Sequence, residues 1–197
     1  MSITTFSLSI SFKILGCQYD IVLLMDFSGG TEDKRTSYTD LASSLIKTSA
    51  LSIQVCMVRY SGPGREDTVF HLNKHIDSIK AIEEMNSASH LGGTTRTGEA
   101  IRYTIDEFSE KNGGRAHAVK MMIVFTDGYS QDEPAVAAKE AQKLGINIRV
   151  VAIEDENLPP NRNQLNEIAG NPKVPLLNFY HELLLPINFH HKIIIAI

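Results

Sequence analysis

The 197-residue sequence contains only two cysteines, no apolar run of membrane-spanning length and no cluster of lysine or arginine residues. Two cysteines are too few for a disulfide-dense scaffold. No segment approaches the roughly 20 consecutive apolar residues that a transmembrane helix requires. With a net charge of -4, the chain also lacks the basic surface with which proteins follow nucleic-acid phosphates. We therefore expect a single globular domain that neither binds nucleic acid nor inserts into a membrane.

The two cysteines are not expected to bond to each other. Cys56 lies in the apolar run 53–58, which favours a buried free thiol. Cys17 precedes the first predicted strand, so the pair should not reach the Cα separation of roughly 5.5–6 Å that a disulfide needs.

We interpret residues 1–16 as an N-terminal extension or a weak signal-like segment. They are a poor match to a signal peptide because they lack a basic start and Lys13 interrupts their apolar part.

Two strongly apolar runs each end in an aspartate, and they are the most informative pattern in the chain. They cover residues 21–26, ending at Asp26, and residues 121–127, ending at Asp127. Continuous apolar runs of this length are typical of strands buried on both faces of a parallel sheet. In open α/β sheets, ligands bind beyond the carboxyl ends of the strands. The two acids are therefore placed to share one ligand.

Hydroxyl side chains lie in the loops between these acids. Ser28 follows Asp26, and Thr95 stands in the loop 92–98, whose sequence is GGTTRTG. Carboxylates and hydroxyls without a nearby histidine or cysteine cluster form a hard-oxygen set that suits a magnesium-like cation. Aspartates at strand ends often only cap loops. Two such acids together with the serine and threonine loops favour the cation site.

Strand and helix patterns alternate along the rest of the chain, which predicts a doubly wound, mostly parallel α/β sheet with helices on both faces. Residues 51–60 and 146–153 are predicted strands, and residues 68–72 a short antiparallel edge strand. Helical spacing predicts inward faces at Tyr38, Leu41, Leu45 and Thr48; Ile76, Ile79 and Ile82; Ile101, Ile105 and Phe108; Ala137, Ala141 and Leu144; and Leu165 and Ile168.

Capping residues locate two of these helices. Thr36 or Ser37 is expected to cap the first helix. Asp132 is expected to cap the fourth, Pro134 fits its first turn, and Gly145 should end it.

We place the domain at residues 17–171 and treat residues 172–197 as an atypical C-terminal tail. Its prolines break any helix, and no amphipathic pattern is present although a complete domain of this type should end in a helix. The apolar segments 183–185 and 193–195 predict either an edge strand or a poorly ordered tail.

Four sequence blocks together match a known family. They are YDIVLLMDFS at 19–28, VRYS at 58–61, GGTTRTGEAI at 92–101 and VFTDGYSQD at 124–132. In their order and spacing, the chain resembles a von Willebrand factor type A domain, as found in integrins, matrilins and microfibrillar collagens. The resemblance covers about residues 19–171, and the last block is most similar to the extracellular-matrix branch.

This resemblance implies a Rossmann-like fold and a metal-ion-dependent adhesion site formed by Asp26, Ser28, Thr95 and Asp127. Thr95 has the family's spacing in the middle loop, and Thr94 is a neighbouring candidate. Such a site holds Mg²⁺ or Mn²⁺ and leaves one position for a glutamate or aspartate of a protein ligand. The resemblance therefore implies a non-enzymatic adhesion module that engages a matrix or cell-surface protein in an extracellular location.

The sequence departs from the family pattern at Gly30, where the third motif position is otherwise a serine or threonine. One hydroxyl ligand is therefore missing, so cation binding is expected to be weaker or absent. Thr31 is adjacent, but its side chain would serve only if the loop shifted by one residue. Gly30 could instead be required by a positive backbone φ angle.

Three classes of function remain open. The first is a cation-dependent protein-binding module, and the second is a metal-free structural or assembly module on the same fold. The third is a magnesium-dependent phosphotransfer enzyme, which needs a second acid or a positioned lysine that the sequence does not offer beside Asp26 or Asp127. Ser28 is disfavoured as a nucleophile because it lacks the Gly-x-Ser-x-Gly turn and a histidine partner.

Overall fold

The structure is a computed structural model that describes residues 18–48, 53–153, 158–170 and 193–196. They form a six-stranded sheet in the order β3-β2-β1-β4-β5-β6. The strands are β1 (Tyr19–Asp26), β2 (Ile53–Tyr60), β3 (Glu66–Phe70), β4 (Val119–Phe125), β5 (Asn147–Ile153) and β6 (Ile193–Ala196). The four central strands are parallel, which confirms the predicted mostly parallel sheet.

Both edges of the sheet are antiparallel. β3 pairs with β2 as predicted, although it begins at Glu66 and ends at Phe70 rather than covering residues 68–72. β6 pairs with β5 at the opposite edge. The C-terminal tail therefore supplies a second antiparallel edge strand, which was one of the two expectations for it. Residues 171–192 of the tail lie outside the described ranges.

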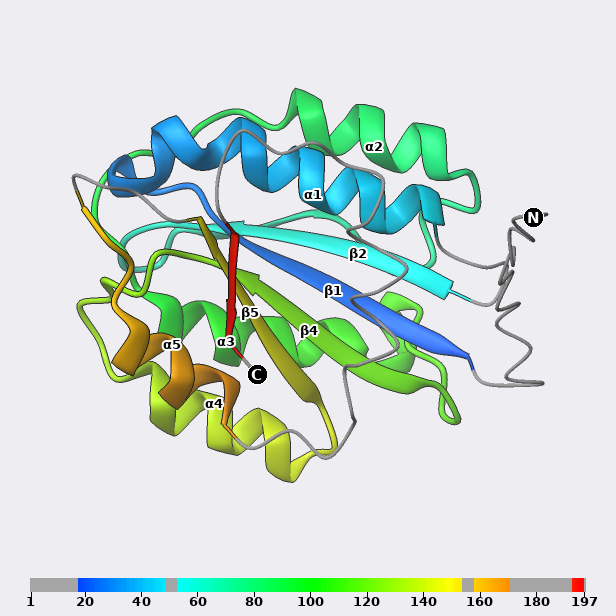
Figure 1. The fold of residues 1–197 in the computed structure, drawn as a ribbon. Helices are drawn as coiled ribbons and strands as arrows, with labels where there is room; N and C mark the ends of the chain where they lie inside the picture. The colour runs from blue at the N-terminus through cyan, green and yellow to red at the C-terminus, as the bar shows by residue number, and fades with distance from the viewer. Residues whose placement is uncertain (1–17, 49–52, 154–157, 171–192, 197) are drawn as a thin grey trace, which may run out of the picture.

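Helices cover both faces of the sheet, as Figure 1 shows. One face carries α1 (Arg35–Thr48) and α2 (Ser78–Ser87), and the other carries α3 (Thr97–Ile105), α4 (Pro134–Lys143) and α5 (Arg162–Ala169). Short 3₁₀ helices are η1 (Gly29–Lys34), η2 (Asp106–Phe108) and η3 (Glu110–Asn112). In the part of the chain that the structure describes, no helix is long and apolar enough to cross a membrane.

The central strand β1 contributes to two separate hydrophobic cores. Ile21, Leu23 and Met25 pack against the core under α1 and α2. Val22 and Leu24 point the opposite way, into the core under α3, α4 and α5. Because successive residues of a strand face opposite sides, burial on both sides requires an unbroken apolar run. The continuous run in the sequence is therefore explained by the position of β1 between β2 and β4.

The first helical segment begins earlier than the capping residues suggested. Gly29–Lys34 form η1, which leads directly into α1 at Arg35. Thr36 and Ser37 consequently lie inside α1, and the prediction that one of them caps it is wrong. The polar residues that looked like a helix start belong to a chain that is already helical, and Ser28 is the N-cap of η1.

Two predicted inward helix faces are wrong in part. Ile76 precedes α2 and is fully exposed, Ile79 is 63% exposed, and α2 instead buries Ala81 and Met85. The side chain of Asp77 caps α2 and accepts a hydrogen bond from the Ile79 N–H, which sets the start of the helix. At the end of α4, Leu144 occupies the C-cap and is also exposed.

Other expectations about the core are confirmed. Leu165 and Ile168 of α5 are buried, and so are Ala137 and Ala141 of α4. Cys56 is a buried free thiol on β2, as predicted. Cys17 lies outside the described residues.

The rotation of α2 gives a stability prediction. Met85→Ala should lower the free energy of unfolding by about 2–5 kcal/mol, because it removes a fully buried side chain and leaves a cavity. Ile79→Ala, on the exposed face of the same helix, should change it by less than about 0.5 kcal/mol. Urea denaturation of both variants measures the difference. Equal losses in the two variants would show that the packing of α2 is not as described.

Candidate functional site

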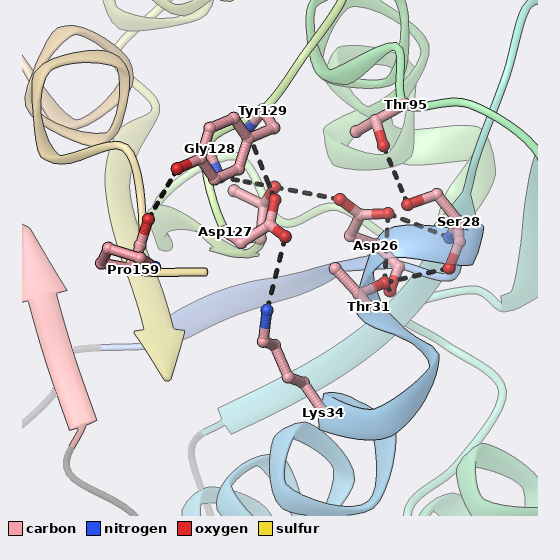
Figure 2. A network of polar contacts seen from close by, with 10 residues as sticks. Asp26, Ser28, Thr31, Lys34, Thr95, Asp127, Gly128, Tyr129 and Pro159 are labelled. Carbon is pink, nitrogen blue, oxygen red and sulfur yellow. Dashed lines mark hydrogen bonds and ion pairs between the residues drawn. The ribbon is translucent and has the colours of Figure 1, made fainter. Parts of the chain in front are cut away.

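Asp26 ends β1 with its carboxylate buried and hydrogen-bonded on both oxygens. The backbone N–H of Ser28 donates to Oδ1 at 3.0 Å, and the hydroxyl of Thr126 donates to Oδ2 at 3.0 Å. The side chain has no exposure to solvent. Since Thr126 follows β4, which pairs with β1, the carboxylate is held between the ends of two neighbouring strands. Figure 2 shows this network.

The structure brings Thr95 to Ser28. The Thr95 hydroxyl donates to the Ser28 hydroxyl at 2.8 Å, and both side chains are buried. Their loops run side by side through backbone hydrogen bonds from Gly29 N to Gly93 O and from Gly92 N to Phe27 O, each 3.0 Å. The choice of Thr95 over its neighbour agrees with this geometry, since Thr94 is exposed.

Asp127 stands in the loop that follows β4, at the same edge of the sheet as Asp26. Its carboxylate accepts a hydrogen bond from the Tyr129 N–H at 3.3 Å and lies 3.6 Å from the Lys34 ammonium. The turn behind it depends on Gly128, which has φ +82° and where a Cβ would lie 2.9 Å from the Asn161 carbonyl. This turn fixes the direction of the Asp127 side chain.

Gly30 and Thr31 lie in the first turn of η1, beside the two aspartates. Gly30 has no positive φ angle, so the backbone does not require glycine there. A Cβ at Gly30 would meet only Asp127 Oδ2, at an ordinary 3.8 Å. Thr31 is buried, and its hydroxyl donates to the Asp26 carbonyl at 2.8 Å and lies 3.4 Å from Asp26 Oδ1. The hydroxyl of Thr31 therefore supports the turn after Asp26.

The two aspartates carry charge that the fold has removed from water. Burial raises the pKa of Asp26 from its ordinary value of 3.8 to about 6; hydrogen bonds from Ser28 oppose this shift and the negative charge of Asp127 adds to it. Burial also raises the pKa of Asp127, against the opposing influence of the Lys34 ammonium. Both carboxylates therefore lie where a nearby positive charge is favourable.

The donor set of this site is made of oxygen. No three His, Cys, Asp or Glu side chains gather as a metal-binding group in the described part of the chain. A cation here would rely on Asp26, Asp127 and the hydroxyls of Ser28 and Thr95. Carboxylate and hydroxyl oxygens fit a hard cation such as Mg²⁺ or Mn²⁺. Gly30 contributes no oxygen from its side chain, so the set is one hydroxyl short of the family pattern.

Asp132 has a different structural role from the one predicted. It does not cap α4, whose N-cap is Glu133. Its carboxylate instead accepts hydrogen bonds from the N–H groups of Gly98 (2.9 Å) and Glu99 (2.8 Å), at the start of α3. A further contact from the same loop runs from Gln131 N to the Thr95 carbonyl at 3.0 Å. The loop after β4 therefore holds the loop that carries Thr95.

Sequence reasoning missed Lys34 and Thr126. Thr126 immediately precedes Asp127, so its place at the end of a buried strand was a usable signal. Lys34 lies in the charged stretch 32–35, which is typical of an exposed surface. In the structure its side chain is only 5% exposed. No local pattern distinguishes it from its charged neighbours.

Comparison with known proteins decides the family. The von Willebrand factor type A domain family matches residues 20–182. The chain belongs to this family. It is 34% identical to chicken (Gallus gallus) matrilin-1 over 169 residues, covering 80% of this chain and 32% of matrilin-1. It is 30% identical to the mouse (Mus musculus) collagen alpha-6(VI) chain over 162 residues, covering 79% of this chain and 7% of the collagen.

The chain thus spans about a third or less of these two relatives. The names of these two relatives, a matrilin and a collagen, describe no enzyme, in agreement with the prediction that this von Willebrand factor type A domain is non-enzymatic. The sequence resemblance stated from the four blocks is confirmed by the family match.

Two solved structures share the fold. One is proximal thread matrix protein 1 from the mussel byssus, with a zinc-occupied MIDAS motif, the abbreviation for metal-ion-dependent adhesion site. It has a TM-score of 0.68 at 22% identity, covering 78% of this chain and 41% of that one. The manganese-loaded Plasmodium vivax TRAP protein has a TM-score of 0.68 at 20% identity, covering 91% and 78%. At these identities the likeness shows the fold alone.

The raised pKa of Asp26 predicts how stability depends on pH. The folded state binds this proton more tightly than the unfolded chain, so stability falls as pH rises from about 4 to about 6. In the presence of a metal chelator, Asp26→Asn should remove this component. The difference in the free energy of unfolding between Asp26→Asn and the parent should therefore increase, in favour of the variant, by roughly 2–3 kcal/mol as pH rises from about 4 to about 6. This follows from about 1.4 kcal/mol for each pKa unit.

Urea denaturation at a series of pH values measures this difference. Asp40→Asn, which changes an exposed acid on α1, serves as the control and should follow the parent curve. Parallel curves for the parent and Asp26→Asn would contradict the prediction.

Proposed function

We propose that residues 17–171 form a cation-dependent protein-binding module of an extracellular matrix or cell-surface protein. In this proposal Asp26, Ser28, Thr95 and Asp127 hold one Mg²⁺ or Mn²⁺ ion, which receives an acidic side chain of a protein ligand. The observation that carries the proposal is the 2.8 Å contact between the Thr95 and Ser28 hydroxyls, beside a buried carboxylate.

Several features support this function. The site gathers oxygen donors from three loops that are far apart in the sequence, and it buries two acids at one sheet edge. The mussel protein, which shares the fold, has zinc in its MIDAS motif, and the Plasmodium protein is manganese-loaded. The names matrilin-1 and collagen support an extracellular setting.

The chain's own residues prepare the site. When bound, a divalent ion supplies a positive charge that attracts a partner carboxylate. Ser28 and Thr95 offer neutral oxygens, so the negative charge of the donor set comes only from Asp26 and Asp127. The Ser28 N–H and the Thr126 hydroxyl hold the Asp26 carboxylate in one orientation. Such support of a ligating group limits the reorganisation that binding requires.

A metal-free structural or assembly module on the same fold is the second candidate. The observation that favours it is the ion pair between Lys34 and Asp127, whose side chains are 5% and 4% exposed. Together with the missing hydroxyl at Gly30, this pair reduces the need for a metal ion. The two candidates differ in whether the isolated domain binds a divalent cation.

Calorimetric titration with Mg²⁺ and Mn²⁺ separates the two candidates. We expect the parent domain to bind the ion and Asp127→Ala to abolish binding, because it removes one of the two charged donors. Asp40→Ala removes an exposed acid on α1 and should leave the affinity unchanged. An absence of binding in the folded parent would contradict the first candidate and favour the metal-free module.

Gly30→Ser should tighten cation binding by roughly fivefold, the equivalent of about 1 kcal/mol for one added polar contact. Position 30 has no positive φ angle and offers space for a Cβ, so the thermal midpoint should stay close to that of the parent. Calorimetry and thermal unfolding measure the two quantities. A folded Gly30→Ser variant that binds no more tightly would show that this position does not limit the site.

A further inference from the structure

Lys34 is a buried cation at the candidate site. It is the last residue of η1, and its side chain is only 5% exposed. Its ammonium lies 3.6 Å from Asp127 Oδ2. Figure 2 marks this ion pair with a dashed line. Lysine is almost never fully buried unless it is paired with an acid. The position of Lys34 is therefore tied to the charge of Asp127.

Lys34 and Gly30 face the same oxygen atom. A Cβ at Gly30 would approach Asp127 Oδ2 to 3.8 Å, and this is the oxygen that pairs with the Lys34 ammonium. Both residues belong to η1. The helix that lacks the third hydroxyl thus carries a positive charge directed at the same acid.

Two positive charges at one buried carboxylate oppose each other. A divalent cation held by Asp127 would lie close to an ammonium in surroundings from which water is largely excluded. Like charges repel strongly under such conditions, because the screening by solvent is weak. Occupation by a metal ion and the present position of Lys34 are therefore in conflict.

We propose that Lys34 is an internal competitor of the divalent cation, which pairs with Asp127 in the metal-free domain and is displaced when the cation binds. This inference rests on the proposed function and adds its regulation. The apparent affinity for the cation is then the intrinsic affinity multiplied by the fraction of molecules in which Lys34 does not pair with Asp127. Without metal, Lys34 compensates the charge of Asp127. The cation binds only at concentrations high enough to displace the lysine.

Cation titration of Lys34→Met tests this competition. Methionine keeps the approximate length of the side chain and removes its charge, so Mg²⁺ and Mn²⁺ should bind about tenfold more tightly than to the parent. Lys47→Met, which changes an exposed lysine of α1, is the matched control and should bind like the parent. A folded Lys34→Met variant with equal or weaker affinity would overturn the inference while the cation-binding function stands. No binding in the parent, Lys34→Met or Gly30→Ser would overturn both.

Amine labelling of the unmodified protein tests the displacement without any substitution. A low dose of an acylating reagent is applied with and without saturating Mg²⁺, and mass spectrometry follows each lysine. Lys34 should react slowly in the metal-free domain and several-fold faster with the cation, whereas Lys47 should react equally in both. An unchanged Lys34 rate in a domain that binds the cation would overturn the inference. This measurement also decides the question if Lys34→Met does not fold.

Discussion

The parallel pairing of β1 with β4 is the constraint on which the site depends. It brings the ends of two buried strands together, and each end leads to an acid, Asp26 or Asp127. Two buried carboxylates of like charge are unfavourable unless nearby groups compensate them. That compensation comes from the Ser28 N–H, the Thr126 hydroxyl and the Lys34 ammonium. The sheet places two buried acids close together, and the groups around them offset the electrostatic free energy that this arrangement costs.

The features that could be predicted from the sequence are those with a local cause. A strand buried on both faces must be apolar at every position, so β1 and β4 could be recognised from continuous runs. The carboxyl ends of parallel strands share one edge, which predicted the neighbourhood of the two acids. The choice of Thr95 as the threonine of the site followed from family spacing rather than from any local pattern. Its geometry depends on hydrogen bonds between the loops.

The features that were missed depend on distant partners. Asp132 stands just before α4 and looked like its cap, but the N–H groups of α3 lie within reach and bind its carboxylate. Ile79 had the spacing of an inward face, yet α2 packs Ala81 and Met85 into the core instead and leaves Ile79 exposed. Lys34 resembled its exposed neighbours. Each outcome depends on packing between elements. The periodicity of residues along a single helix or strand carries no information about that packing.

A lysine and a divalent cation compensate the same charge but cannot perform the same function. The ammonium of Lys34 is buried beside Asp127, so it stabilises the acid without presenting a position to a partner. A metal ion held by a few protein oxygens keeps a coordination position for an incoming carboxylate. Charge compensation during folding and recognition of a ligand are therefore separable requirements in this domain. In the proposed function, the absence of a hydroxyl at Gly30 would weaken only the second requirement, since Lys34 already compensates the charge of Asp127 in the fold.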